Sequence, residues 1–275
     1  MRKILEKVSY HAVYDASVLD ALHYARDNGF AGVQVAVEAP HLSFERLDER
    51  ARAEIADFRR ASGLRISLHA PDDIVSFFTR DERLREGIFA YFEALFRFAE
   101  AVGCEIITVH PGYVVRYRTD TVPIETMPAG DAEAYQRAFA ENLERLIDLA
   151  AGRFVLCLEN SELTRWVRPI VQPFLDAGRL ALCWDVARTH DKQGVLDAAL
   201  DSFFWDNLDH VRQVHLHDIR DGLSHAVLGT GCVDFLYFLP RLAEAEVVDY
   251  CIEVRPREKA LESLEALREM ARQGS

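Results

Sequence analysis

Short apolar runs alternate along the chain with longer segments in which apolar residues recur at helical spacing. The runs are five to eight residues long, and Gly or polar residues follow each of them, which is typical of buried strands. We expect eight strands, at Lys7–Val13, Gly32–Val37, Leu64–Leu68, Cys104–Val109, Phe154–Leu158, Leu180–Trp184, Val211–Leu216 and Val247–Val254.

The segments between the runs carry apolar stripes typical of helices that pack on a sheet. The longest stripe predicts a helix over about Asp81–Val102. Ser17 and Ser43 are the expected N-caps of the first two helices, which should end at Gly29 and Gly63. Further helices are expected over about Ala132–Ala151, Arg165–Ala177, Gly194–Leu208, Phe235–Glu244 and Glu258–Arg272.

Eight strand–helix units at roughly 30-residue spacing predict an α/β fold of the (β/α)8 TIM-barrel type. No linker, low-complexity tract or composition break interrupts the pattern, so we expect one TIM-barrel domain over residues 1–275. A doubly wound sheet is the alternative, but neither G-x-G-x-x-G nor a P-loop follows the first strand. In a (β/α)8 barrel the active site lies at the C-terminal ends of the strands.

The stretch Gly112–Gly130 is longer than an ordinary loop of a compact domain. Loops of this length usually act as lids or binding loops. Tyr113, Arg116 and Tyr117 are its candidates for closing over a substrate.

Six of the expected strands end in a histidine or a carboxylate. Side chains alternate between the two faces of a strand, so residues two positions earlier share the face of these polar ends. Those earlier residues are small or weakly polar, and the residues between are apolar, which predicts a ring of polar side chains above an inner layer of the barrel. The ring is His69, His110, Glu159, Asp185, His215 and Glu253, and the inner layer is Ser67, Thr108, Cys157, Cys183, Gln213 and Cys251.

Three imidazoles and three carboxylates around one barrel mouth predict a mixed nitrogen and oxygen site for a divalent cation such as Mn, Co, Mg, Ni or Zn. Three carboxylates would repel one another unless a cation or protons neutralised them. Any one of these residues alone would more simply be a capping or hydrogen-bonding residue. The register that all six share favours the metal site.

Several short stretches, in this order, resemble the xylose isomerase-like TIM-barrel superfamily, the group of sugar phosphate isomerases, epimerases and endonuclease IV. The resemblance covers nearly the whole chain. Its carriers are His69-Ala70-Pro71, His110-Pro111-Gly112, Leu158-Glu159-Asn160, Asp185-Val186, Val214-His215-Leu216-His217-Asp218, His225, Leu228-Gly229-Thr230-Gly231 and Ile252-Glu253.

The resemblance implies roles for individual residues. In the isomerase and epimerase members, the residues matching Glu159, Asp185, His215 and Glu253 hold one divalent metal. Those matching Glu159 and Glu253 are also the acid and base. In the endonuclease-type members, the residues matching His69 and His110 hold a second metal, so these two are candidates for a second metal or for substrate.

The chain departs from the family pattern at Arg188, where a histidine is usual. Arginine stays protonated and is a poor ligand, which disfavours a three-metal nuclease site. We expect Arg188, Arg255 and His225 to contact substrate, the arginines through a phosphate or carboxylate group. Arg220 and Arg257 are weaker candidates for the same role. The alternative is that these arginines pair with the chain's own carboxylates.

The charge and the cysteines narrow the classes of partner. A net charge of −13 disfavours duplex DNA and anionic membranes, so we expect a small-molecule substrate.

The N-terminus has no apolar core of a signal peptide, and no apolar stretch reaches the ~18–20 residues that span a bilayer. Five cysteines without a Cys-x-x-Cys pair suggest free thiols and a cytoplasmic protein. A homo-oligomer is compatible with the sequence.

The predicted function is that of a divalent-metal-dependent isomerase or epimerase of a small sugar, sugar acid or sugar phosphate. Two carboxylates would move a proton through an enediolate while a metal polarises the carbonyl. A lyase or dehydratase on the same site remains an alternative. So does an endonuclease IV-like phosphodiesterase, although Arg188 and the negative charge count against it. A binding barrel without catalysis would not need two flanking carboxylates.

Overall fold

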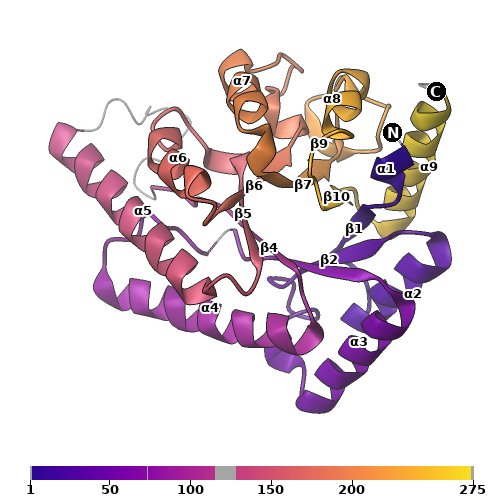
Figure 1. Ribbon diagram of the computed structural model, residues 1–275, viewed down its shortest axis with the longest axis horizontal. Helices are drawn as coiled ribbons and strands as arrows, with labels where there is room; N and C mark the ends of the chain where they lie inside the picture. Colours follow the sequence, from indigo (N-terminus) through magenta and orange to yellow (C-terminus); the bar gives the residue numbers. More distant parts are fainter. Residues whose placement is uncertain (1, 73, 115–127, 274–275) are drawn as a thin grey trace.

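Eight parallel strands close into a barrel in the computed structural model, which describes residues 2–72, 74–114 and 128–273. β1 pairs with both β2 and β10, so the first and last strands of the ring meet. The predicted (β/α)8 TIM-barrel fold is therefore confirmed (Figure 1). The barrel strands are β1 (Val8–Ala12), β2 (Gly32–Ala36), β3 (Arg65–His69), β4 (Ile106–Val109), β5 (Val155–Glu159), β6 (Ala181–Asp185), β7 (Val211–Leu216) and β10 (Asp249–Ile252).

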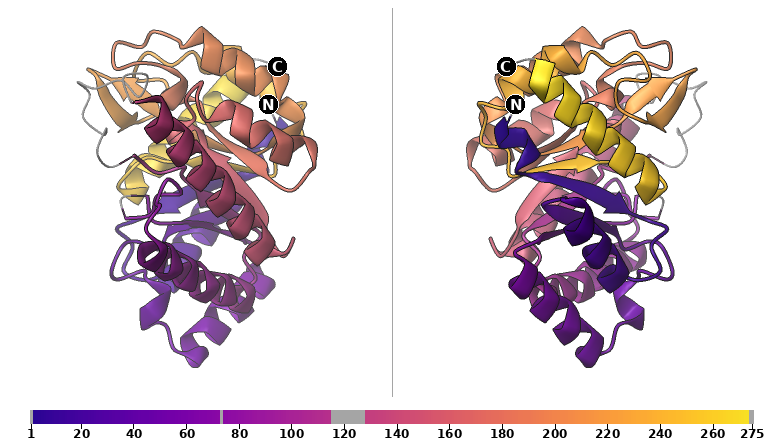
Figure 2. Two further views of the ribbon diagram at one scale, coloured as in Figure 1. Left: turned by 90° about the vertical axis from the view of Figure 1, so that its left-hand side faces the viewer. Right: turned by 90° about the vertical axis from the view of Figure 1, so that its right-hand side faces the viewer.

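Helices surround the strands on the outside of the ring (Figure 1). The C-terminal helix α9 packs on β1 and on the short helix α1, so the two ends of the described chain lie on the same side of the molecule (Figure 2). The helices are α1 (Arg2–Leu5), α2 (Val18–Asn28), α3 (Glu49–Ser62), α4 (Glu82–Val102), α5 (Ala129–Ala150), α6 (Arg168–Asp176), α7 (Ala198–Asp206), α8 (Phe235–Leu242) and α9 (Arg257–Gln273).

The expected helix boundaries are correct at α2 and wrong at the start of α3. The Ser17 hydroxyl accepts the amide hydrogen of Asp20 at 3.1 Å and caps α2, as predicted. Ser43 instead caps a single 3-10 turn, and α3 begins later, where the Asp48 carboxylate accepts the Ala51 amide hydrogen at 2.8 Å. A carboxylate at the N-terminus of a helix also interacts favourably with the helix dipole.

The inward-facing side chains form a polar network inside the barrel. The Gln34 amide donates to Thr108 Oγ1 at 3.1 Å, and the Thr108 hydroxyl donates to the Gln213 carbonyl oxygen. Gln213 Nε2 donates to Asp249 at 2.8 Å, and the Cys251 thiol donates to Gln34 at 3.3 Å. The predicted register is therefore confirmed. The other predicted members of this layer are also buried: Ser67, Cys157 and Cys183.

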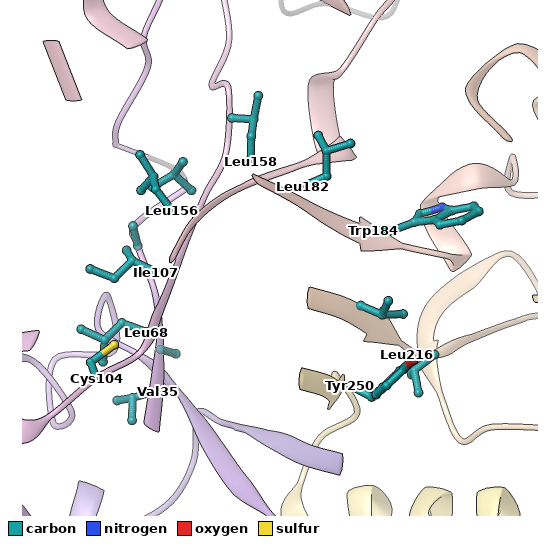
Figure 3. Close-up of a cluster of buried hydrophobic side chains, with 14 of the residues drawn as sticks. Val35, Leu68, Cys104, Ile107, Leu156, Leu158, Leu182, Trp184, Leu216 and Tyr250 are labelled. Atoms are coloured by element: carbon teal, nitrogen blue, oxygen red, sulfur yellow. The ribbon is translucent and has the colours of Figure 1, made fainter. Parts of the chain in front are cut away.

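The opposite face of each strand packs against the helices. Leu68, Leu158 and Trp184 point away from the barrel interior, as Figure 3 shows, and they belong to the large apolar core between strands and helices. Trp184 stacks on Phe204 of α7, with ring centroids 4.6 Å apart. Burial of side chains this large contributes about 1.5–3 kcal/mol each, and this core holds the strand ends in place.

A short antiparallel hairpin rises above β7 where the sequence predicted only a loop. It consists of β8 (Asp218–Arg220) and β9 (Leu223–Ala226). Asp221 and Gly222 join the two strands with positive φ angles of 54° and 74°, the arrangement of a type I′ turn. The Asp-Gly dipeptide is the sequence signal for such a turn, and it places His225 back over the barrel mouth.

The stretch expected to act as a binding loop lies mostly outside the described residues, including Arg116 and Tyr117. Within the described part of the chain, no helix has the length and apolar character needed to cross a bilayer.

Candidate active site

The barrel brings the six predicted strand-end side chains together at one mouth. His69, Glu159 and Asp185 are the last residues of β3, β5 and β6, and His215 is the penultimate residue of β7. The other two, His110 and Glu253, follow β4 and β10 directly. All six are buried, with exposed fractions of at most 6 %.

Glu159 lies at the centre of the cluster. Its Oε2 is 3.0 Å from His110 Nε2 and 3.2 Å from His215 Nδ1, and its Oε1 is 3.2 Å from Arg188 Nε. Burial raises the pKa of the Glu159 carboxyl, but the charges and hydrogen bonds of His110 and His215 outweigh burial and hold that pKa well below its usual range. Glu159 is therefore a carboxylate at neutral pH.

Glu253, which follows β10, approaches the same nitrogen of His215 as Glu159 does. Its Oε1 is 3.1 Å from His11 Nδ1 and 3.3 Å from Arg255 Nη2, and its Oε2 is 3.6 Å from His215 Nδ1. Burial again opposes ionisation, yet the hydrogen bond from His11 and the charge of His215 hold the pKa of Glu253 well below its usual range. The two carboxylates thus approach the same nitrogen of one imidazole, and the pKa of each is lowered.

Asp185 is held by backbone and side-chain groups that follow β6 and β7. Its Oδ1 accepts the backbone N–H of Ala187 and Arg188 at 3.0 and 3.1 Å, and its Oδ2 lies 3.0 Å from both Arg188 Nε and His217 Nε2. Burial raises the pKa of Asp185, but His217 and Arg188 overcome it and lower that pKa. His217 is thus a buried partner of Asp185, one of the candidate metal ligands.

The donor atoms at the mouth fit a divalent cation. One donor each from Asp185, His215 and Glu253 lies within 4.8 Å of the other two, and Glu159 approaches the same imidazole. Among the described residues, His215 Nε2 is buried without a hydrogen-bond partner, and Glu253 Oε2 has no contact with His215 closer than 3.6 Å from its Nδ1. Unpartnered buried polar atoms are costly, and a cation shared by these side chains would offset that cost.

The four arginines considered as substrate contacts lie in two different places, two at the barrel mouth and two away from it. Arg188 and Arg255 lie at the mouth, where Arg188 contacts Glu159 and Asp185 and Arg255 contacts Glu253 and His11. Arg257 instead bonds Asp15 and Asp20 beside α2, and Arg220 lies on the exposed hairpin next to Asp221. The ion-pair alternative therefore describes all four arginines in the structure, and substrate contact by Arg188 and Arg255 stays a prediction.

His225 reaches the mouth from β9. Its Nδ1 lies 2.8 Å from the Glu253 carbonyl oxygen, its backbone N–H donates to His217 Nδ1 at 3.1 Å, and the two imidazole rings are 4.4 Å apart. Its φ of 63° is unusual for a residue other than glycine. The hairpin turn was the sequence signal that could have placed it.

Asp218 fixes the loop that follows the hairpin, a role that sequence reasoning missed. Its carboxylate accepts the backbone N–H of Ile219, Gly231 and Val233 at 2.8, 2.8 and 3.0 Å. A Cβ on Gly231 would overlap the Ile219 carbonyl oxygen, so only glycine fits there. The Leu228–Gly231 motif therefore belongs to a loop whose backbone N–H groups donate hydrogen bonds to the buried Asp218 carboxylate.

Comparisons with known proteins agree with this architecture. The family described as "Xylose isomerase-like TIM barrel" matches residues 22–270. A D-tagatose 3-epimerase-like protein superposes with a TM-score of 0.76 at 18 % identity over 96 % of each chain. The 3-keto-D-glucoside 4-epimerase of E. coli, in its apo form, gives 0.72 at 17 % identity over 96 % of this chain and 98 % of that one. Endonuclease IV from Thermus thermophilus gives 0.68 at 21 % identity over 97 % and 99 %. A search of curated proteins found no significant match.

Proposed function

Because the chain belongs to the xylose isomerase-like TIM-barrel family, we propose that it is a divalent-metal-dependent isomerase or epimerase of a small sugar, sugar acid or sugar phosphate. The observation that carries the proposal is the pair of buried carboxylates, Glu159 and Glu253, that approach His215 Nδ1 at 3.2 and 3.6 Å. The sugar epimerases among the similar folds support the same class of substrate.

Glu159, Asp185, His215 and Glu253 would hold the cation. A bound divalent metal would supply Lewis-acid polarisation of a substrate carbonyl, which acidifies the neighbouring C–H bond. His217 and the Arg188 backbone orient the Asp185 carboxylate, because both donate hydrogen bonds to its oxygens.

The proton transfer itself falls to Glu159 and Glu253. Both lie within the mouth, but β6 and β7 separate β5 from β10 in the ring, so the two carboxylates reach the centre from different sides. One carboxylate accepts the proton from the carbon beside the carbonyl, and the other returns a proton to the opposite face or to the neighbouring carbon. His11 Nδ1 lies 3.1 Å from Glu253 Oε1 and positions that carboxylate.

Arg188 and Arg255 would bind the polar end of the substrate. Their side chains are 37 % and 31 % exposed at the rim, while their inner atoms contact the acid and base. A guanidinium group in this position would receive a carboxylate, a phosphate or a sugar oxygen. His225, packed on His217 and 30 % exposed, would close the same side of the mouth.

Solvent deuterium exchange tests the proposed chemistry. The metal-supplemented protein is incubated in D₂O with ketoses, sugar acids and sugar phosphates, and the recovered compounds are analysed by NMR. We expect deuterium at one carbon beside the carbonyl of at least one compound. Elimination products would instead identify a lyase or dehydratase. Absence of exchange with every class, together with cleavage of an abasic duplex, would replace the proposal with the phosphodiesterase alternative.

A further inference from the structure

A second cluster of ligand-type side chains lies beside the proposed metal site. His11 and His69 are on β1 and β3, and Glu38 follows β2, which lies between those strands in the barrel. One donor atom from each of the three residues lies within 4.8 Å of the other two. The two imidazole rings are 5.2 Å apart and inclined by 31°. Three neighbouring strands thus deliver two imidazoles and one carboxylate to one place.

Each imidazole has one nitrogen engaged and one unpartnered. His69 Nε2 lies 3.2 Å from His110 Nε2 and 3.6 Å from Glu159, and His11 Nδ1 lies 3.1 Å from Glu253. The other nitrogens, His69 Nδ1 and His11 Nε2, are buried without a hydrogen-bond partner among the described residues. Both histidines are only 3 % exposed, so water does not solvate these nitrogens freely. Buried polar atoms of this kind normally have a partner.

Glu38 connects the cluster to solvent. Its side chain lines a cavity of about 520 Å³ between the loops that follow β2 and β3, together with Pro40, Asp72 and Tyr91. An ion can reach the carboxylate through this cavity without crossing the proposed active site.

We propose that His11, Glu38 and His69 bind a second divalent cation, separate from the one at Asp185, His215 and Glu253. Two imidazoles and one carboxylate suit Zn²⁺, Co²⁺, Ni²⁺ or Mn²⁺ better than Ca²⁺ or Mg²⁺, which prefer oxygen ligands. Three protein ligands with one open position form a site that water or a substrate oxygen can complete. The inference does not depend on the reaction proposed above.

The structure favours this cluster over His69, His110 and Glu159, the second-metal candidates from the family resemblance. In that alternative the His110 and His69 nitrogens already lie within hydrogen-bond distance of each other, and His110 lies 3.0 Å from Glu159. A cation there would have to replace existing contacts. The cluster of His11, Glu38 and His69 instead contains two ring nitrogens that have no hydrogen-bond partner among the described residues.

Metal stoichiometry tests the inference. The full-length protein is stripped with a chelator, dialysed against Zn²⁺ or Mn²⁺, and measured by elemental analysis and by calorimetric titration. We expect two ions per chain in the wild type and one in Glu38→Gln, with the affinity of the lost ion reduced more than about 100-fold, beyond the effect of losing a residue that only orients a ligand. Glu38 is exposed, so the substitution should leave the fold intact, which circular dichroism checks.

Two matched variants separate the possible outcomes. His110→Gln should keep both ions, and Asp185→Asn should lose the other ion while keeping the one at Glu38. Two ions in Glu38→Gln, or loss of an ion in His110→Gln alone, would overturn the inference. One ion in the wild type that only Asp185→Asn removes would also overturn it and leave the proposed function standing. Two ions in Asp185→Asn would contradict the proposed metal ligands instead.

Discussion

The barrel mouth has two arcs of opposite character. The early arc, from β1 to β4, carries three imidazoles and one carboxylate: His11, Glu38, His69 and His110. The strand ends of the late arc, from β5 to β10, carry three carboxylates and one imidazole: Glu159, Asp185, His215 and Glu253. Two further imidazoles, His217 and His225, lie beyond the end of β7. In the late arc each carboxylate meets a cationic side chain from a nearby loop, whereas in the early arc two ring nitrogens have no partner among the described residues.

The difference arises in the loops and not in the strands. The strands share one inward register, so each can present a polar end to the same space. Among the described residues, the loops of the late arc place two guanidinium groups at the barrel mouth. They belong to Arg188, after β6, and Arg255, after β10. The late arc therefore places guanidinium groups against its buried carboxylates, which favours their ionised form, while the early arc leaves two buried ring nitrogens without a hydrogen-bond partner among the described residues.

The largest expected effect is the loss of either carboxylate of the late arc. Glu159→Gln or Glu253→Gln should lower kcat by about 10³-fold or more, because an amide cannot take up a proton from carbon. The measurement is turnover of whichever compound exchanges deuterium. The matched early-arc control, Glu38→Gln, should retain turnover to within about 10-fold when the late site is loaded, because that substitution leaves both proton-transfer groups in place. Comparable losses of turnover in all three variants would mean that the early and late arcs do not differ in their contribution to proton transfer.

The fold and the register were predictable because they depend on pattern. Apolar runs at strand length and helical stripes between them specify a barrel, and the polar ends at Glu159 and Asp185 follow from the period of two along a strand. The contact between Arg188 and both of these carboxylates was not predictable, because a side chain's direction depends on the loop that carries it. The sequence allowed substrate contact or ion pairing, and only geometry shows the pairing.

Local turn chemistry accounts for the remaining errors. The Asp221-Gly222 turn carries His225 to Glu253, yet strands of three and four residues produce almost no periodic signal. The Ser43 cap was wrong because a serine and an aspartate five residues apart can both begin a helical segment, and only the Asp48 carboxylate initiates an α-helix.

The next effect concerns the loop that supports the late arc. Gly231→Ala should destabilise the protein by about 2–3 kcal/mol, because its Cβ would overlap the Ile219 carbonyl oxygen and lie 2.5 Å from Asp218 Oδ1. Denaturant unfolding measures the change. Gly63→Ala is the control from the early half: its φ is 72° but no atom lies within 4 Å of the added Cβ, so about 1 kcal/mol is expected. Equal losses of unfolding free energy in the two variants would mean that the residues around Asp218 move to accommodate the added Cβ without strain.

The third prediction concerns Arg188, the arginine that pairs with two carboxylates of the late arc. Arg188→His should change the ratio of kcat/KM between anionic and neutral sugars by about 10- to 100-fold, the range expected when a hydrogen bond to a charged group is lost. Metal content should change less than substrate preference, because the proposed ligands remain. Arg220→His, on the exposed hairpin, is the matched control and should alter neither quantity. A large gain of bound metal in Arg188→His would show that position 188 belongs to the metal site.

The smallest expected effect comes from a comparison of two helix N-caps, one in the early half of the barrel and one in the late half. Ser17 caps α2 in the early half, and Asp234 caps α8 in the late half by accepting the amide hydrogens of Leu236 and Tyr237 at 3.1 and 3.2 Å. Ser17→Ala and Asp234→Ala should each cost about 1 kcal/mol in unfolding free energy, because each leaves helix-end N–H groups without a partner. Equal losses would confine the difference between the arcs to the mouth. A late-half loss well above the early one would instead mean that α8 supports the β8–β9 hairpin and, through it, His225.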